Sequence, residues 1–147
     1  MLLTIENLSV SFGNANTSVC ALDKVSLCLS SNETLGIIGE SGSGKTTLGL
    51  SIMGLLTQAN IYGEIEFDGC KLMSLNGNGW RKVRWKRIAM VFQNALEVFN
   101  PVITVGEQVA EPLITHMHLP KEDALAKVSE LFKMTGLEPK WRNAYAH

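Results

Sequence analysis

Eight consecutive residues, Gly39 to Thr46, have the types and the spacing that bind a phosphate group. Their sequence, Gly-Glu-Ser-Gly-Ser-Gly-Lys-Thr, fits the pattern G-x-x-x-x-G-K-[S/T] at every specified position. The glycines at 39, 42 and 44 allow positive φ angles and a close approach to a ligand, so that successive N–H groups can point at phosphate oxygens. The lysine would reach the β- and γ-phosphates, and the threonine hydroxyl would hold Mg²⁺. The alternative is a flexible Gly/Ser loop that contains a lysine.

Two flanking segments would position this loop. Residues 34–38, Thr-Leu-Gly-Ile-Ile, predict a short buried strand before it. Residues 46–56 predict a helix after it, because four leucine and isoleucine side chains recur on one face. The N-terminus of that helix would add unpaired N–H donors and the positive end of the helix dipole. Strand, glycine loop and helix together are the arrangement that anion binding needs.

Further strands are predicted on both sides of the loop. Apolar and polar residues alternate over 3–12, with one interruption, and again over 25–30. Residues 63–69 alternate acidic with apolar side chains and end in Asp-Gly, a strong turn signal. Residues 88–92, Ile-Ala-Met-Val-Phe, predict a second buried strand. These elements indicate an α/β protein.

The second half of the chain is predicted to be mainly helical. Thr104 and Glu107 have capping-box spacing at the start of a helix over 105–116. Residues 121–135 have the clearest amphipathic pattern, and Gly136 stands where a C-terminal cap belongs. We therefore divide the chain into a nucleotide-binding core over 1–92 and a partial helical subdomain over 93–147.

Composition and charge narrow the class of protein. A chain of 147 residues that is 46% hydrophobic can bury one modest core, and its formal net charge of −1 gives no electrostatic case for nucleic acid or an anionic membrane. No apolar run approaches the length of a membrane span. The stretch from Trp80 to Arg87, with five cations and two tryptophans, is a local exception. We interpret it as a solvated helix face with its tryptophans turned inward, the alternative being a contact with lipid headgroups or RNA.

The order of the motifs resembles the ATP-binding subunits of ABC transporters over essentially the whole chain. Residues 10–13, Val-Ser-Phe-Gly, look like the A-loop of this family, and residues 39–46 look like its Walker A loop. Residues 88–93 are similar to the strand that enters the Q-loop. Residues 100–108, followed by Ala-Glu-Pro-Leu at 110–113, resemble the subfamily that drives import of oligopeptides, dipeptides and nickel. The implied fold is a P-loop NTPase core with N-terminal antiparallel strands, followed by the start of a helical subdomain, as an incomplete domain.

The resemblance also implies roles for individual residues. Phe12 would stack on adenine, although a phenylalanine that closes a strand is otherwise more often a core residue. Gln93 would contact Mg²⁺ and the attacking water, Lys45 would stabilise phosphate charge, and Thr46 would share the Mg²⁺ with Gln93. The residues implied to bind the nucleotide are Phe12, Gly39, Glu40, Ser41, Gly42, Ser43, Gly44, Lys45, Thr46 and Thr47.

Several motifs of the family do not occur in these residues. We find neither the signature Ser-Gly-Gly-Gln-like loop nor an apolar run ending in Asp-Glu, the Walker B strand that supplies the general base. The switch histidine is missing too, because Tyr145-Ala146-His147 resembles the Tyr-x-His that precedes the signature. We expect such a chain to bind Mg·ATP weakly without meaningful hydrolysis. We also expect the unpaired edge of strand 34–38 to make it marginally stable or oligomeric.

The resemblance implies partners that the sequence itself does not identify. These are a second ATP-binding subunit, identical or related, the transmembrane permease subunits and, indirectly, a solute-binding protein, on the cytoplasmic face of the cell membrane. Two alternatives remain open at this stage. One is another P-loop enzyme such as a kinase or GTPase, and the other is a non-catalytic, truncated interaction module.

Overall fold

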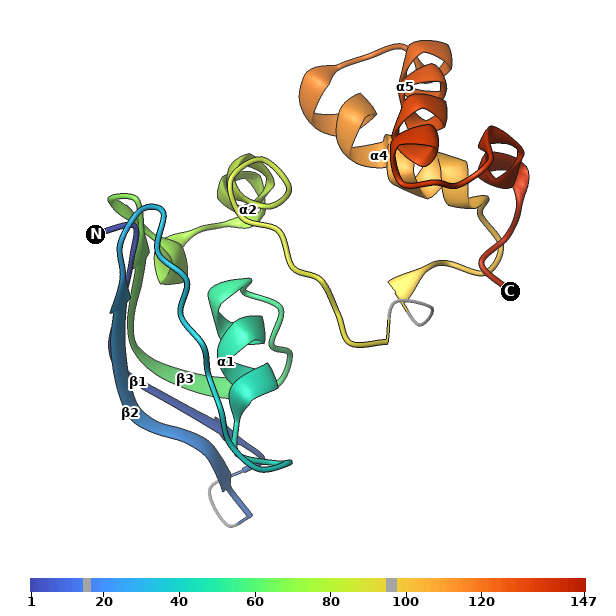
Figure 1. Cartoon of the computed structure of the whole chain (residues 1–147). Coiled ribbons are helices and arrows are strands. Elements are labelled where there is room, and N and C mark those ends of the chain that lie inside the picture. The colour runs from blue at the N-terminus through green and yellow to red at the C-terminus, as the bar shows by residue number, and fades with distance from the viewer. Residues whose placement is uncertain (15–16, 95–97) are drawn as a thin grey trace. The chain divides into compact units, whose positions relative to one another are not determined.

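The computed structural model describes residues 1–14, 17–94 and 98–147. The chain divides into two compact units, Met1–Met90 and Val91–His147, each with its own hydrophobic core. Figure 1 labels the elements of both.

The first unit contains a four-stranded antiparallel sheet in the order β2-β1-β3-β4. Its strands are β1 (Leu3–Phe12), β2 (Val19–Leu29), β3 (Ala59–Phe67) and β4 (Cys70–Lys71). The alternation predicted over 3–12 is confirmed, and its one interruption is a bulge at Asn7, whose φ of 48° shifts the register on both sides of β1. The predicted Asp68-Gly69 turn joins β3 to β4 with φ angles of 46° and 74°, as a two-residue hairpin requires.

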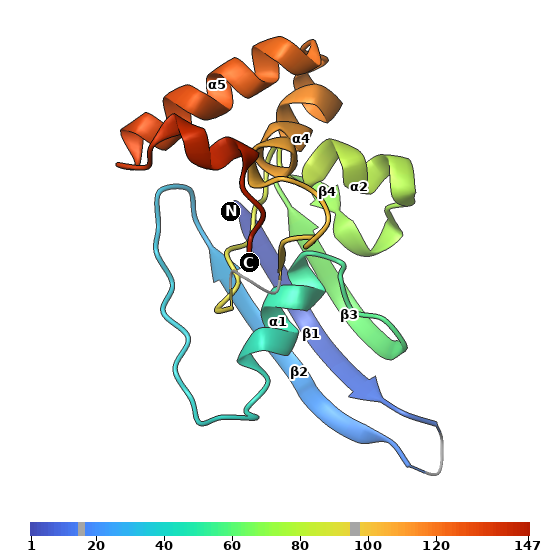
Figure 2. The same cartoon turned by 90° about the vertical axis from the view of Figure 1, so that its right-hand side faces the viewer.

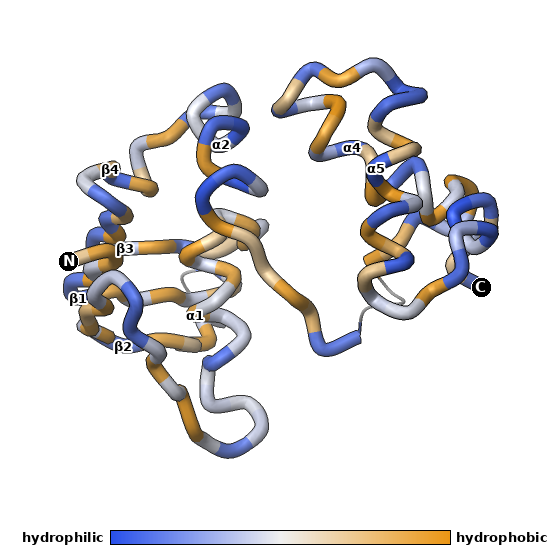
Figure 3. Tube along the Cα trace, turned by 45° about the horizontal axis from the view of Figure 1, so that its top comes forward, coloured by the Kyte–Doolittle hydropathy of each residue, from blue (hydrophilic) through white to orange (hydrophobic). Residues whose placement is uncertain are grey.

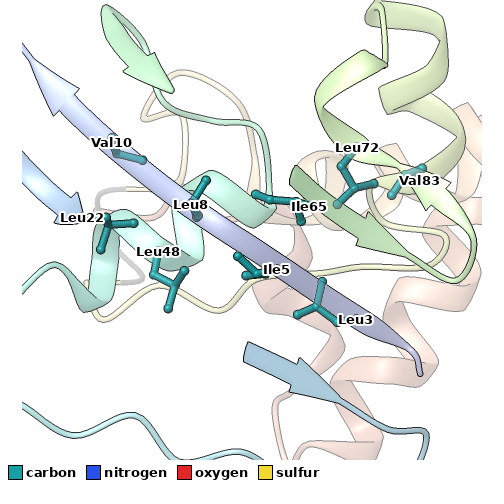
Figure 4. Close-up of a cluster of buried hydrophobic side chains, with 9 residues drawn as sticks. All are labelled: Leu3, Ile5, Leu8, Val10, Leu22, Leu48, Ile65, Leu72 and Val83. Atoms are coloured by element: carbon teal, nitrogen blue, oxygen red, sulfur yellow. The ribbon is translucent and has the colours of Figure 1, made fainter. Parts of the chain in front are cut away.

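One face of this sheet carries the core of the first unit. Helix α1 (Lys45–Ile52), the short helix η1 (Leu72–Ser74) and helix α2 (Gly77–Val83) each contribute a buried side chain to it. Figure 2 shows α1 lying across the sheet, and Figure 4 shows the buried cluster. Its members are Leu3, Ile5, Leu8, Val10, Leu22, Leu48, Ile65, Leu72 and Val83.

Helix α1 is shorter than the predicted 46–56. It ends at Ile52, and Gly54 takes the left-handed conformation with a φ of 59°. The Arg84 guanidinium then donates to the carbonyls of Met53 and Gly54 at 2.9 and 2.6 Å. Carbonyl groups at the end of a helix lack partners within it. A side chain distant in sequence therefore caps α1.

The strands predicted at 34–38 and 88–92 do not form. Residues 34–38 belong to an open loop between β2 and α1, seen in Figure 2, in which Leu35 and Ile37 are half exposed and Ile38 is 98% exposed. Residues 88–92 make a single isolated bridge, between Ile88 and Arg84. A strand needs a hydrogen-bonding neighbour, and no strand of the described residues pairs with either segment. These two predictions were wrong for this structure.

The basic stretch also differs from its prediction. Helix α2 ends at Val83 instead of continuing to Arg87. Trp80 turns inward as predicted and packs against the core and Gly54. Trp85 does not, because it follows the helix end in a turn with a φ of 65° that leaves its side chain 66% exposed.

The second unit consists of helices. Helix α4 (Val105–Met117) and helix α5 (Lys121–Met134) pack through Ala110, Ala124, Val128 and Phe132, and η2 (Pro139–Asn143) lies against both. The predicted capping box is confirmed, because the Thr104 hydroxyl accepts the Glu107 N–H and donates to the Glu107 carboxylate. Both predicted helices therefore form close to their predicted limits.

Hydropathy alternates over short distances along both units, as Figure 3 shows. Among the described residues, no helix combines the length and the apolar character that crossing a membrane would need.

Candidate functional site

The glycine loop leads directly into the N-terminus of α1. Gly42 and Gly44 have φ angles of 83° and 90°, the left-handed conformations expected of them. Gly39 does not have a positive φ, so that part of the prediction was wrong. Position 39 has no space for a side chain, because a Cβ there would lie 2.6 Å from Ser43 Oγ and 4.0 Å from Lys45 Nζ. Gly39 therefore lies close to the side chains of Ser43 and Lys45.

Gly44 lets the loop approach the sheet. A Cβ at this position would lie 2.6 Å from the Ala21 carbonyl oxygen and 2.8 Å from a methyl carbon of Leu22, both on β2. The helix that follows is anchored on the core by Leu48, whose N–H donates to the Gly44 carbonyl at 2.9 Å. The start of α1 is thus fixed against β2.

Lys45 is the first residue of α1, and its side chain folds back onto the loop. Its ammonium group donates to the carbonyl oxygens of Gly39 and Glu40 at 2.7 and 2.6 Å and to Ser43 Oγ at 3.2 Å. Three acceptors around the nitrogen match the three hydrogens of an ammonium group. The positive charge is therefore held at the centre of the loop, beside the N-terminus of α1.

The N-terminus of α1 has the donors that an anion requires. Among the described residues, no side chain caps it, and none of the residues in its first turn is acidic. Thr46 is exposed and Thr47 is half exposed, while the neighbouring loop residues Glu40 and Ser41 are exposed as well. Unpaired N–H groups, the helix dipole and the Lys45 ammonium together favour negative charge at this point.

Phe12 belongs to the same unit as the loop. It is the last residue of β1, paired with Val19 on β2 and with Ala59 on β3. Its ring is half-buried and packs against the core cluster, so only part of it faces solvent. The end of β1 thus holds a partly exposed aromatic ring, and its stacking on adenine stays a prediction.

Gln93 lies in the second unit. It is exposed and lies in a bend. The structure therefore brings the loop residues and Phe12 into one unit and leaves Gln93 in the other, and its contact with Mg²⁺ and water stays a prediction.

Gln108 is a positioning residue that sequence reasoning did not single out. Its amide nitrogen donates to the carbonyls of Asn100 and Ile103 at 3.0 and 2.8 Å, and its amide oxygen accepts the Asn100 N–H at 2.7 Å. Asn100 Oδ1 also accepts the Val102 N–H at 3.1 Å. The side chain thus fixes the turn that precedes α4. The sequence feature that could have indicated this role is an Asn-Pro pair, which favours a turn, followed by a glutamine in the first turn of the next helix.

The comparisons with known proteins all indicate the same family. Residues 22–146 match the family model described as "ABC transporter". The chain is 37% identical over 138 residues to the oligopeptide transport ATP-binding protein AppD of Bacillus subtilis, covering 92% of this chain and 42% of that protein. It is 37% identical over 150 residues to the dipeptide transport ATP-binding protein DppD of Haemophilus influenzae, covering 99% and 46%. The chain spans less than half the length of these two curated relatives.

Solved structures show the same fold. The structure is similar to the ATP-binding cassette MJ0796 in a dimeric, post-hydrolysis state bound to ADP and Pi, with a TM-score of 0.82 at 28% identity. The match covers 97% of this chain and 61% of that one. A second dimeric structure of MJ0796 matches with a TM-score of 0.80 at 30% identity, over the same shares of the two chains.

Proposed function

This chain belongs to the ABC transporter family, and we propose that it is the ATP-binding part of an ATPase that powers import of peptides, nickel or a related small solute. One observation carries the proposal. The Lys45 ammonium lies within 2.7 Å of two loop carbonyls, beside an uncapped helix N-terminus. Membership of the family supports a nucleotide as the anion that this site would bind.

The residues present fit a nucleotide triphosphate. The loop and the first turn of α1 offer backbone donors to phosphate oxygens. Lys45 would hold the β- and γ-phosphates, and the exposed Thr46 hydroxyl would hold Mg²⁺ together with Gln93. Phe12 would hold the adenine. Bound Mg·ATP would supply the phosphoryl group, whose transfer to water depends mainly on positioning and charge stabilisation.

The names of the relatives support the substrate class. The two relatives described above are named for oligopeptide and dipeptide transport. Peptide import is therefore the first proposal, and nickel import rests on the resemblance of residues 100–113 to the wider subfamily. The choice of solute is proposed to lie in other subunits of the transporter.

The assembly is proposed on the same basis. The matching MJ0796 structures are described as dimeric. We infer that this part of the protein pairs with a second ATP-binding subunit, identical or related, and works on permease subunits at the inner face of the cell membrane, with a solute-binding protein acting indirectly.

A competition experiment tests the proposed function. A fluorescent ATP analogue is bound to the chain with Mg²⁺ and displaced by unlabelled nucleotides. We expect ATP to displace it better than GTP, and we expect Phe12→Ala to weaken ATP binding while leaving binding of inorganic triphosphate unchanged. A preference for GTP would instead point to another class of P-loop protein. Hydrolysis is measured in parallel against Lys45→Ala, and turnover well above that control would contradict our expectation of binding without catalysis.

A further inference from the structure

The exposed tryptophan after α2 has no role in the proposed nucleotide site. Trp85 is 66% exposed although tryptophan gains more than most residues from burial. Its φ of 65° is rare for a bulky residue. Three backbone hydrogen bonds close the turn that holds it. The carbonyl of Val83 accepts the N–H groups of Arg87 and Ile88 at 2.9 and 3.2 Å. The Trp85 N–H donates to the Ile88 carbonyl at 2.9 Å. The backbone therefore holds the ring outward.

The cations around Trp85 fall into two groups. Arg84 is used internally, because it caps α1 and lies over the Trp80 ring at 4.4 Å. Arg87 pairs with Asp68 and lies over the Phe67 ring at 5.3 Å. Arg81, Lys82 and Lys86 are exposed, and no ion pair or side-chain hydrogen bond of theirs occurs in the described part of the chain. These three cations and Trp85 form what we call the Trp85 patch.

We propose that the Trp85 patch binds the surface of an anionic phospholipid membrane. The indole ring combines an apolar body with one N–H donor, which suits the boundary between headgroups and acyl chains. Flanking lysine and arginine side chains are attracted to anionic headgroups within a Debye length. The internal bonds of Arg84 and Arg87 fix the turn on the protein, and the exposed ring and the three exposed charges all belong to the short stretch 81–86.

Charge favours a lipid surface over nucleic acid. The chain as a whole has a formal net charge of −1, and three free cations are fewer than the phosphate contacts of a typical nucleic-acid site. Binding to a membrane requires only a small basic patch, because a planar surface contacts one side of the protein and not the acidic residues elsewhere on it. This inference concerns residues outside the phosphate loop and does not rest on the proposed function.

Vesicle flotation tests the proposal with the full chain, its monomeric state first checked by size-exclusion chromatography. The vesicles are phosphatidylcholine alone or with about one-third phosphatidylglycerol. We expect binding to the anionic vesicles only, and we expect it to fall as salt is raised. Lys82→Gln/Lys86→Gln should weaken binding about thirtyfold, or about fivefold for each charge removed. Trp85→Gly should weaken it about tenfold, because part of an aromatic ring then no longer leaves water.

The controls separate the patch from general charge and from folding. Lys127→Gln/Lys133→Gln removes the same charge from exposed positions on α5 and should leave binding unchanged. Glycine adopts the backbone conformation of Trp85 freely, so Trp85→Gly keeps the turn. Equal binding to neutral vesicles, wild-type binding by either patch variant, or tighter binding of the patch to single-stranded RNA than to vesicles would overturn the proposal.

Discussion

Lys45 donates a hydrogen bond from its ammonium group to the carbonyl oxygen of Gly39, over 2.7 Å, and thereby closes the glycine loop on itself. The same nitrogen reaches the Glu40 carbonyl and Ser43 Oγ, so one side chain organises three loop residues. These hydrogen bonds hold the loop in its present shape. The position of the Lys45 ammonium group depends on these three oxygens, so the loop geometry should be sensitive to small changes at Gly39.

We predict that Gly39→Ala weakens nucleotide binding about tenfold, the effect of losing roughly one charge-assisted hydrogen bond. The new Cβ would meet Ser43 Oγ at 2.6 Å, and moving that hydroxyl removes one acceptor of Lys45. Titration with the fluorescent ATP analogue measures the effect. Gly36→Ala is the matched control, because its Cβ has no atom within 4 Å, and it should change the affinity less than about twofold. Equal affinities of the two variants would contradict this account of Gly39.

A second glycine, Gly106, is predicted to matter for stability. It is buried at the start of α4, and a Cβ there would meet the Arg142 carbonyl oxygen at 2.5 Å and its carbonyl carbon at 3.1 Å. Backbone atoms cannot rotate away, so the clash should outweigh the gain in helix propensity and cost about 1–3 kcal/mol. Urea unfolding followed by circular dichroism measures the change. Gly77→Ala at the open start of α2 should be neutral or slightly stabilising.

Acid should weaken the contacts of Glu107. Hydrogen bonds from Lys121 and Thr104 lower the pKa of its carboxyl group, with the Lys121 charge adding to the effect. A lowered folded-state pKa means that the stabilisation is present above the ordinary glutamate pKa of about 4.3 and is lost as pH falls through the lowered value. The wild type should therefore lose more stability than Glu107→Gln between about pH 5 and pH 3. Thermal unfolding across this range measures it.

Glu122→Gln is the control for that experiment. Glu122 lies in the first turn of α5, where it makes no ion pair with any described residue. Its variant should keep the acid sensitivity of the wild type. A pH dependence that is the same in all three proteins would show that the Glu107 contacts are not populated in solution.

Trp85→Gly should not destabilise the protein, although it deletes a large side chain. The ring is mostly exposed, and the positive φ of 65° is unfavourable for tryptophan and free for glycine. Relief of this strain opposes the entropic cost of a glycine, so we expect the free energy of unfolding to stay constant or rise by up to about 1 kcal/mol. Trp80→Gly removes the ring that packs on Gly54 and should instead lower the free energy of unfolding by about 3 kcal/mol or more. A similar loss for both variants would mean that Trp85 also packs.

Much of the fold could be predicted from local patterns. The alternation along β1 and β2, the Asp68-Gly69 turn and the Thr104–Glu107 capping box all depend on residues close in sequence. Even the interruption in β1 had a local cause, the bulge at Asn7. Each of these patterns reflects an interaction between residues close in sequence, and the structure agrees with each of them.

The errors arose where a distant partner decides the outcome. Residues 34–38 are apolar enough for a buried strand, but pattern alone does not supply the neighbour that a strand needs. The end of α1 depends on Arg84, thirty-one residues beyond Met53, which no helix signal indicates. At the candidate site the motif correctly predicted the positive φ angles of Gly42 and Gly44. It could not tell that Gly39 is required by space instead of by its φ angle.

The most direct test of the account is calorimetric titration of the chain and of Lys45→Ala with Mg·ATP. We predict measurable binding by the wild type and an affinity at least about tenfold lower for the variant, because charged hydrogen bonds to the phosphates are lost. Circular dichroism confirms that both proteins are folded. Equal affinities, or no binding of Mg·ATP by the folded wild type, would contradict the assignment of residues 39–46 as a nucleotide site.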